Sequence, residues 1–231
     1  MEQASPFHPS GILTLRTVQK FPWRYTKRQM QQPEDEAREA LLIAASQRGD
    51  VTAFNSLAAL HERAVYTVAY RTLGNADAAA DVTQDALLAA YQHVRSFRGG
   101  SFRAWLARIT VNKAYDALRA SQRRRESSLD VTVPPEQQDA PMDRIADDDP
   151  EGVALQRELG HTLQVALQTL PRDQRTVVVL FDIQGYSYDE IAYIERTRVG
   201  TVKSRLSRAR ARLRDYLIEH REQLPEHFRL P

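Results

Sequence analysis

The chain contains no cysteine, which excludes disulfide bonds and zinc sites built on thiolates. Its six histidines are scattered, without a close helical pair of the kind that holds a metal ion. No apolar run approaches the roughly 20 residues that span a bilayer, and the apolar stretch at 11–15 is too short for a signal-peptide core. We therefore expect no cofactor or metal, no membrane insertion and a cytoplasmic location.

Alternation of apolar and polar residues with period two is also absent over any useful length, so no β-sheet is predicted. Apolar residues recur instead at helical spacing over residues 34–123 and again over 152–221. Breaks at 49–50, 74–75 and 99–101 each join a helix-stopping glycine to a residue that can cap the next helix. The sequence therefore predicts an all-α fold with two helical domains.

The remaining segments lack a sustained period. Residues 1–33 carry four prolines and read as a mostly disordered N-terminal arm, although translation that begins at Met30 is an open alternative. Residues 124–151 combine prolines with a dense acidic run, and such a segment buries too little apolar surface to offset its ordering entropy. We expect a flexible acidic linker there and a short tail at 222–231.

Charge is distributed in blocks, although the formal net charge is only +2. Residues 119–125 and 203–214 are strongly basic, whereas residues 139–151 are acidic. Blocks of opposite sign indicate separate roles, and the basic ones are suited to face phosphate groups.

The last third of the chain has the pattern of a helix-turn-helix. Ser187 and Glu190 have the spacing of a capping box that opens a short helix. A turn is expected near residues 196–199, with a second, basic helix that restarts at Gly200-Thr201 under a cap from the Thr201 hydroxyl. In such a unit the second helix enters the major groove. A merely solvated charged helix is the alternative, and the capped helix in front of it argues against that reading.

The first domain carries two further patterns. Asp81, Gln84 and Asp85 share one helical face at i, i+3 and i+4, an arrangement that either binds a basic partner or simply suits the helix dipole. A second face, preceded by an aromatic stretch, mixes charge, amide and ring. Its members are Arg108, Asn112, Tyr115 and Arg119. That mixture suits single-stranded DNA, because guanidinium groups bind phosphates, rings stack on bases and amides reach base edges. Phe102 and Trp105 are expected to be mainly structural.

These patterns resemble those of extracytoplasmic-function sigma factors, a group of the sigma-70 family. The segments 182–192 and 199–206, together with Leu170-Pro171, resemble region 4 of that family. The segment 81–85 has the Asp-x-x-Gln-acid pattern of region 2.2. The resemblance covers about residues 36–217.

The resemblance implies a non-enzymatic subunit that gives RNA polymerase its promoter specificity. Region 2 would bind the clamp helices of the polymerase β′ subunit through Asp81, Gln84 and Asp85. Regions 2.3 and 2.4 would open and read the −10 element, with these candidates: Arg98, Arg103, Trp105, Arg108, Asn112, Tyr115 and Arg119. Region 4 would bind the β flap and the −35 element, with these candidates: Thr201, Lys203, Ser204, Arg205, Arg208 and Arg210. It also implies an anti-sigma factor, often membrane-anchored, that acts until a stress signal arrives.

A stand-alone helix-turn-helix regulator is the main alternative. Such a regulator would bind duplex DNA without polymerase, and it would leave the acidic face at 81–85 and the aromatic, basic stretch at 97–119 without a purpose.

The sequence departs from the family at the helix-turn-helix turn. The family places an apolar residue, a glycine and another apolar residue where this chain has Glu195, Arg196 and Thr197. A non-glycine residue in a left-handed turn costs on the order of 1 kcal/mol, and an unpaired buried carboxylate costs more. We expect a remodelled turn, in which either Ile194 moves into the gap or Glu195 pairs with a nearby arginine.

Overall fold

The computed structural model describes residues 33–127, 150–220 and 222. Over these residues the chain is helical and contains no strand, which confirms the all-α prediction. The first half holds α1 (Pro33–Gln47), α2 (Val51–Leu73), α3 (Ala76–His93), the 3-10 turn η3 (Val94–Ser96) and α4 (Phe102–Ser127). The second half holds α5 (Pro150–Gln168), α6 (Arg172–Val178), the π-helix η4 (Val179–Ile183), α7 (Tyr188–Glu195) and α8 (Val199–Glu219).

Helices cover both ends of the segment expected to be a linker. Helix α4 continues to Ser127 because the basic run before it consists of good helix formers. Helix α5 begins at Pro150, since proline is favoured in the first turn of a helix. The remaining parts of the predicted arm (1–33), linker (124–151) and tail (222–231) lie outside the described residues.

The predicted breaks of the first half coincide with its helix ends. The Asp50 side chain accepts a hydrogen bond from the Ala53 amide at 3.0 Å, and Asn75 accepts one from Ala78 at 2.7 Å. Both satisfy amide groups that a helix start leaves unpaired. Gly74 closes α2 with φ 78°, a left-handed conformation that glycine adopts without the steric cost of a Cβ.

The first half packs around an aromatic and aliphatic core between α2, α3 and α4. Phe102 is 3% exposed, and its ring centroid lies 5.3 Å from that of Trp105 and 5.4 Å from that of Phe97. Offset and tilted ring pairs of this kind add to the energy of area burial. Phe102 is therefore part of the core, as expected, and half-buried Trp105 packs against the same cluster.

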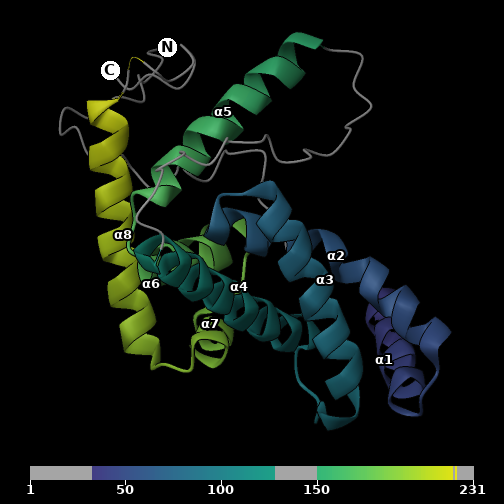
Figure 1. Ribbon diagram of the computed structural model, residues 1–231. Coiled ribbons are helices and arrows are strands. Elements are labelled where there is room, and N and C mark those ends of the chain that lie inside the picture. The colour runs from purple at the N-terminus through teal and green to yellow at the C-terminus, as the bar shows by residue number, and fades with distance from the viewer. Residues whose placement is uncertain (1–32, 128–149, 221, 223–231) are drawn as a thin grey trace, which may run out of the picture.

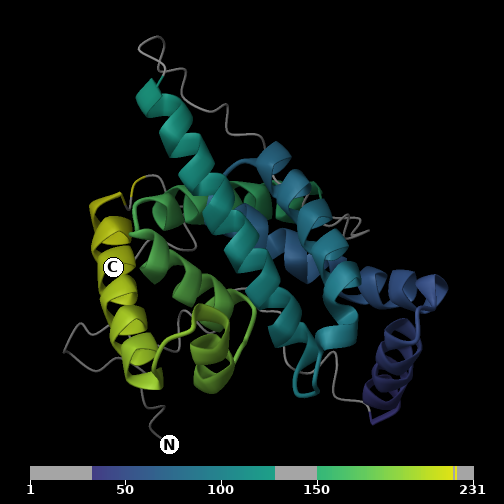
Figure 2. The same ribbon diagram turned by 60° about the horizontal axis from the view of Figure 1, so that its bottom comes forward.

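The two halves share a core. Figures 1 and 2 show α4 lying between the α2–α3 pair and the α6–α8 unit, and α4 and α7 are in contact. Buried Val68, Ala107 and Val111 belong to the same apolar cluster as residues of α6, α7 and α8. The sequence predicted two domains, and it did not predict that they pack against each other.

Two arginines reinforce this packing, of which Arg175 is buried and Arg71 half-buried. Arg175, only 8% exposed, donates to the carbonyl oxygens of Thr72 at 2.6 Å and Leu170 at 3.1 Å, near the ends of α2 and α5. Arg71 donates to the carbonyl of Gly160 at 3.0 Å. The Thr72 carbonyl lies in the last turn of α2, where it has no partner within its own helix, so Arg175 satisfies an acceptor that would otherwise be unpaired. Among the described residues, no helix is both long and apolar enough to cross a membrane.

Candidate nucleic-acid interface

The outward face of α3 carries the acidic pattern. Asp81, Gln84 and Asp85 are all exposed, because Val82 and Ala86 turn the opposite face of the helix into the core. The Lys113 ammonium lies 3.9 Å from an Asp85 carboxylate oxygen, and both side chains are accessible to solvent. An ion pair of this kind contributes little to stability, so the carboxylate stays available to a partner.

An open groove runs beside this face between α2 and α3. Gln84 lies at its edge, and Phe54, Leu88 and Tyr91 give it a mostly apolar lining. Leu88 is 55% exposed and Tyr91 39% exposed. The acidic face therefore adjoins exposed apolar side chains, a combination typical of a protein-binding surface.

Helix α4 carries most of the predicted single-strand-binding residues, and it does not present them all to solvent. Asn112 and Arg119 are exposed, as is Arg98 just before the helix, and Arg119 pairs with Asp116 one turn away. Trp105 is half-buried in the aromatic cluster. The remaining three candidates contact the second half of the chain.

Those three residues contact the segment between η4 and α7, together with α6 and α7. Arg103 donates to the Gln184 carbonyl, and its guanidinium lies 4.0 Å from the centroid of the Tyr186 ring. The Arg108 guanidinium lies 4.8 Å from the centroid of the Tyr193 ring. These stacked cation–π contacts come from residues for which the sequence analysis assigned no such role.

The helix-turn-helix has the predicted capping box. The Ser187 hydroxyl accepts a hydrogen bond from the Glu190 amide at 3.2 Å, and the Glu190 carboxylate accepts one from the Ser187 amide at 2.8 Å. The predicted cap by Thr201 is wrong. Helix α8 begins at Val199, after Arg198 in extended conformation, so Thr201 already lies in the first helical turn.

The sequence left two alternatives for the turn between α7 and α8, a shift of Ile194 into the gap or a pairing of Glu195 with an arginine. The structure shows the pairing. Arg196 takes the left-handed conformation with φ 50° and ψ 47°, and it is the one non-glycine residue among those described with positive φ. Ile194 is buried at 1% exposure as the last apolar residue of α7. Glu195 pairs with an arginine, Arg205 of α8, at 3.4 Å.

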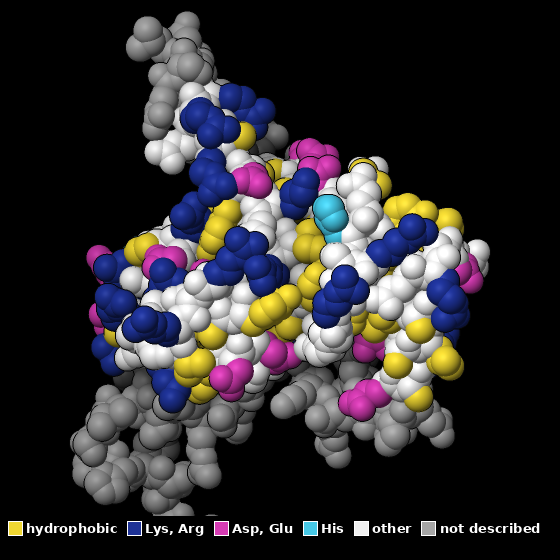
Figure 3. Space-filling view, turned by 90° about the horizontal axis from the view of Figure 1, so that it is seen from below, with side chains coloured by type: hydrophobic (Ala, Val, Ile, Leu, Met, Phe, Trp, Pro, Cys, Tyr) yellow, Lys and Arg dark blue, Asp and Glu magenta, His cyan; other side chains and the backbone are white. Residues whose placement is uncertain are grey.

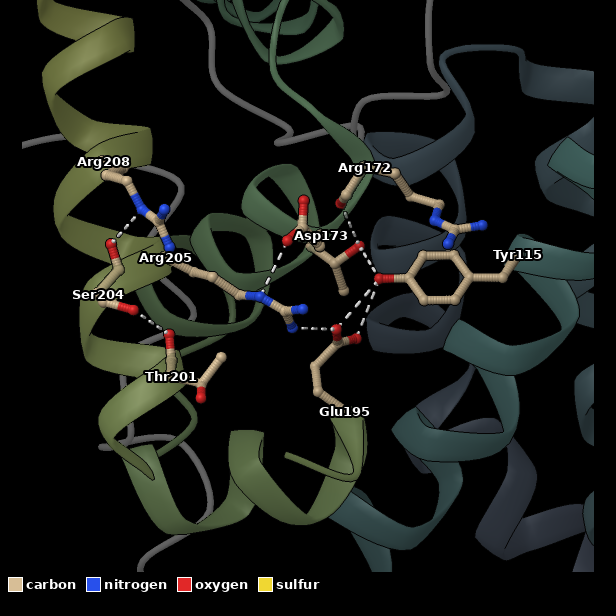
Figure 4. Close-up of polar contacts among 9 residues, drawn as sticks. Tyr115, Arg172, Asp173, Glu195, Thr201, Ser204, Arg205 and Arg208 are labelled. Atoms are coloured by element: carbon tan, nitrogen blue, oxygen red, sulfur yellow. Dashed lines mark hydrogen bonds and ion pairs between the residues drawn. The ribbon is translucent and has the colours of Figure 1, made fainter. Parts of the chain in front are cut away.

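Glu195 lies at the centre of a polar cluster that joins the two halves (Figure 4). Its side chain is 4% exposed, and its two carboxylate oxygens accept from the Tyr115 hydroxyl at 3.1 and 3.3 Å. The same hydroxyl lies 2.9 Å from the Thr176 hydroxyl oxygen. Arg205 also pairs with Asp173 at 2.9 Å. The carboxylate is thus shared between α4 and the basic helix.

Burial sets the protonation behaviour of this cluster. Burial raises the pKa of the Tyr115 hydroxyl, and the neighbouring Glu195 carboxylate raises it further, so the hydroxyl stays protonated and donates. Burial also raises the pKa of Glu195, while the Tyr115 hydrogen bond and Arg205 oppose the rise. The charged carboxylate is therefore held at a cost that its partners only partly offset.

The candidate −35-binding residues on α8 differ in their exposure to solvent. Lys203, Ser204 and Arg208 are exposed near its amino end, and Thr201 is half-buried. Arg205 and Arg210 are partly buried, and each forms an ion pair. Arg205 pairs with Asp173, and the Nε of Arg210 donates to the Asp182 carboxylate at 3.1 Å. Figure 3 shows basic side chains gathered on the side of the molecule that holds α8 and along the projecting end of α4.

Comparison with known families matches both halves of the chain. Residues 57–124 match Sigma-70 region 2, and residues 161–213 match Sigma-70 region 4. The chain is 36% identical over 200 residues to the ECF RNA polymerase sigma factor SigE of Mycolicibacterium smegmatis, covering 85% of this chain and 74% of that one. It is also 36% identical to the ECF RNA polymerase sigma-E factor of Escherichia coli, covering 76% of this chain and 92% of the relative.

Solved structures agree with this. The sigma factor RpoE of Bartonella quintana, solved in complex with the anti-sigma factor NepR, matches with a TM-score of 0.59 and 30% identity, covering 72% of this chain and 98% of RpoE. CnrH, solved with the cytosolic domain of CnrY, gives a TM-score of 0.58 and 28% identity, covering 78% of this chain and 97% of CnrH. This chain belongs to the extracytoplasmic-function sigma factors of the sigma-70 family and is a transcription initiation factor.

Proposed function

We propose that the chain binds core RNA polymerase and directs it to promoters, with region 2 at 34–123 reading the −10 element and region 4 at 152–221 reading the −35 element. The observation that carries this proposal is the pairing, in one chain, of an exposed acidic face on α3 with a basic α8 behind a capped α7. A stand-alone regulator would use the basic α8 and would have no use for the acidic face on α3.

Core binding is assigned to Asp81, Gln84 and Asp85, which meet basic side chains on the β′ clamp helices, while region 4 binds the β flap. The exposure of all three residues and the apolar groove beside them support this assignment. Carboxylates at an interface steer association and set its register more than they add affinity. We therefore expect Asp81→Asn with Asp85→Asn to slow assembly with core polymerase.

The −10 element is assigned to residues of α4 and the segment before it. Asn112 is exposed, and its amide can both donate to and accept from a base edge. Arg98 and Arg119, also exposed, are suited to phosphates. Extruding a base from the stack costs a few kcal/mol, which these contacts have to offset. Trp105, Arg103, Arg108 and Tyr115 complete the surface.

The −35 element is assigned to the amino end of α8. Lys203, Ser204 and Arg208 are exposed there, and a recognition helix enters the major groove with this end. Thr201 lies in the same first turn. Arg205 is paired with Asp173 and Glu195, and Arg210 is paired with Asp182, so we assign these two arginines mainly to the shape of the domain.

Family membership supports the following proposals on partners and location. RpoE was solved with an anti-sigma factor, and we propose that an anti-sigma factor also holds this chain inactive until a stress signal arrives. The chain acts in the cytoplasm, where the polymerase works. It performs no covalent chemistry, because the polymerase forms the phosphodiester bonds.

The test measures how fast the chain assembles with core polymerase, and fluorescence anisotropy of the labelled chain monitors the assembly. The chain should bind core polymerase, and the double variant Asp81→Asn, Asp85→Asn should associate with it more slowly. The control is Asp189→Asn, which removes an exposed carboxylate on α7 and should associate at the rate of the parent. Equal association rates for both variants would remove α3 from the interface. Tight binding to duplex promoter DNA without polymerase, combined with no binding to core, would favour the stand-alone regulator.

A further inference from the structure

Two aromatic rings of the second half contact the basic helix α8. Phe181 belongs to the π-helix η4, and Tyr188 is the first residue of α7. Their ring centroids lie 4.7 Å apart, with an angle of 19° between the ring planes. Both side chains are half-buried and pack against the large apolar cluster that the two halves share. Core packing therefore fixes this stacked pair in place beside α8.

Two basic residues of α8 contact the stacked pair, one on each ring. The guanidinium of Arg210 lies 5.2 Å from the centroid of the Phe181 ring, and the ammonium of Lys203 lies 5.4 Å from the centroid of the Tyr188 ring. Arg210 also donates from its Nε to the Asp182 carboxylate at 3.1 Å. Lys203 is exposed near the amino end of α8. Asp182 therefore offsets the charge of Arg210, whereas the charge of Lys203 stays available to a ligand.

The π-helix η4 supplies both groups that hold Arg210. Phe181 and Asp182 are consecutive in sequence, yet both contact this arginine. A π turn contains more residues than an α turn, so neighbouring side chains diverge less around the helix axis. Such turns are rare and occur frequently at functional sites. The turn anchors the ring pair to α8 at Arg210, and Tyr188 then meets Lys203 nearer the amino end of that helix.

We propose that Tyr188 is a positioning residue for −35 recognition, whose ring holds the Lys203 ammonium where it reads one guanine of the element. The inference rests on the proposed function, because it takes α8 to be the recognition helix. Lysine donates to O6 and N7 of guanine in the major groove. Its long stem is flexible, and fixing it at a binding surface costs side-chain entropy. A ring that already holds the ammonium before DNA binds lowers this cost for one position of the base edge.

The geometry is tested first in the free, full-length chain. The sequence holds four lysines, at positions 20, 27, 113 and 203, so isotope-labelled lysine gives a simple NMR spectrum. The ε-methylene signal of Lys203 should be shifted upfield by the Tyr188 ring. Tyr188→Leu should return it to the value of a solvated lysine, Tyr188→Phe should keep the shift, and Lys113 should not change. An unshifted Lys203 signal in the parent would overturn the proposal.

The effect on recognition is measured with holoenzyme assembled from the chain and core polymerase. Promoter fragments with a randomised −35 element are bound at equilibrium, and the bound fraction is sequenced. Lys203→Ala should lose the preference for guanine at one position. Tyr188→Leu should weaken the preference at that same position about threefold, the size expected of an exposed cation–π contact, and Tyr188→Phe should retain it. In the Lys203→Ala background, Tyr188→Leu should have no further effect.

Tyr216→Leu is the matched control, because it removes a tyrosine ring from the carboxyl end of α8, where that ring stacks on His220. This variant should keep every base preference of the parent, and circular dichroism confirms that each variant is folded.

Three results would each overturn the proposal. They are a uniform loss over the whole −35 element in Tyr188→Leu, an equal loss in Tyr188→Phe, and a loss at a position that Lys203→Ala leaves unchanged. A parent holoenzyme that selects no −35 sequence would overturn the proposed function instead, and the NMR signal of the free chain would still decide whether Tyr188 holds Lys203.

Discussion

Arg196 is the one non-glycine residue with positive φ in the part of the chain that the structure describes. Its φ of 50° places a residue with a Cβ in the left-handed region, at a cost of roughly 1–2 kcal/mol. Glycine avoids that cost but adds about 0.4–1 kcal/mol of conformational entropy to the unfolded chain. The net gain expected from Arg196→Gly is therefore about 1 kcal/mol or slightly less. For a protein of this size that corresponds to a rise in Tm of roughly 2–4 °C.

The assay is reversible thermal unfolding followed by circular dichroism, with Arg196→Ala as the control. Both variants remove the same exposed side chain and its charge, and alanine keeps the Cβ that is strained at this φ. The gain should appear with glycine and not with alanine. Equal effects of the two substitutions would place the cause in the arginine side chain and would refute the argument from backbone strain.

Three further predictions concern the cap of α7, the exposed arginines of α8 and the buried carboxylate of Glu195. Ser187→Ala breaks the capping box of α7 and should lower the free energy of unfolding by about 1 kcal/mol in urea titrations; an unchanged midpoint would deny the cap its role. Arg208→Ala should lower promoter affinity of the holoenzyme and reduce its salt slope by about 1, whereas Arg214→Ala, which removes an exposed charge paired with its neighbour, should change neither in filter binding. Because burial raises the pKa of Glu195, the proton adds stability that is full below the ordinary value of 4.5 and is lost as pH rises through the raised value. The stability of the parent relative to Glu195→Gln should therefore fall as pH rises from acidic to neutral, and a constant difference would contradict the burial of that carboxylate.

The features that the sequence predicted well are those set by neighbouring residues. The capping box at Ser187 and Glu190 and the caps at Asp50 and Asn75 depend on groups three residues apart, so their spacing identifies them. The expected cap at Thr201 failed because α8 begins two residues earlier, at Val199, after Arg198 in extended conformation.

The contacts between the halves could not be predicted in this way. Tyr115 and Glu195 are 80 residues apart in sequence, and nothing in the periodicity of α4 shows which of its faces meets α7. The amphipathic pattern assigned Tyr115 to nucleic acid because an aromatic ring beside arginines suits that role equally well. The one available signal was the polar Glu195 at a position where the family has an apolar residue, and it indicated a partner without identifying Tyr115 as that partner.

The assignment as a promoter-specificity factor is tested most directly by transcription in vitro. The purified chain is added to core polymerase with a library of genomic promoter fragments, beside a reaction without the chain, and the start sites are mapped. We predict starts that depend on the chain and share two upstream elements, with Asn112→Ala reducing initiation to a degree that varies with the −10 sequence. No chain-dependent starts from any fragment would contradict the account.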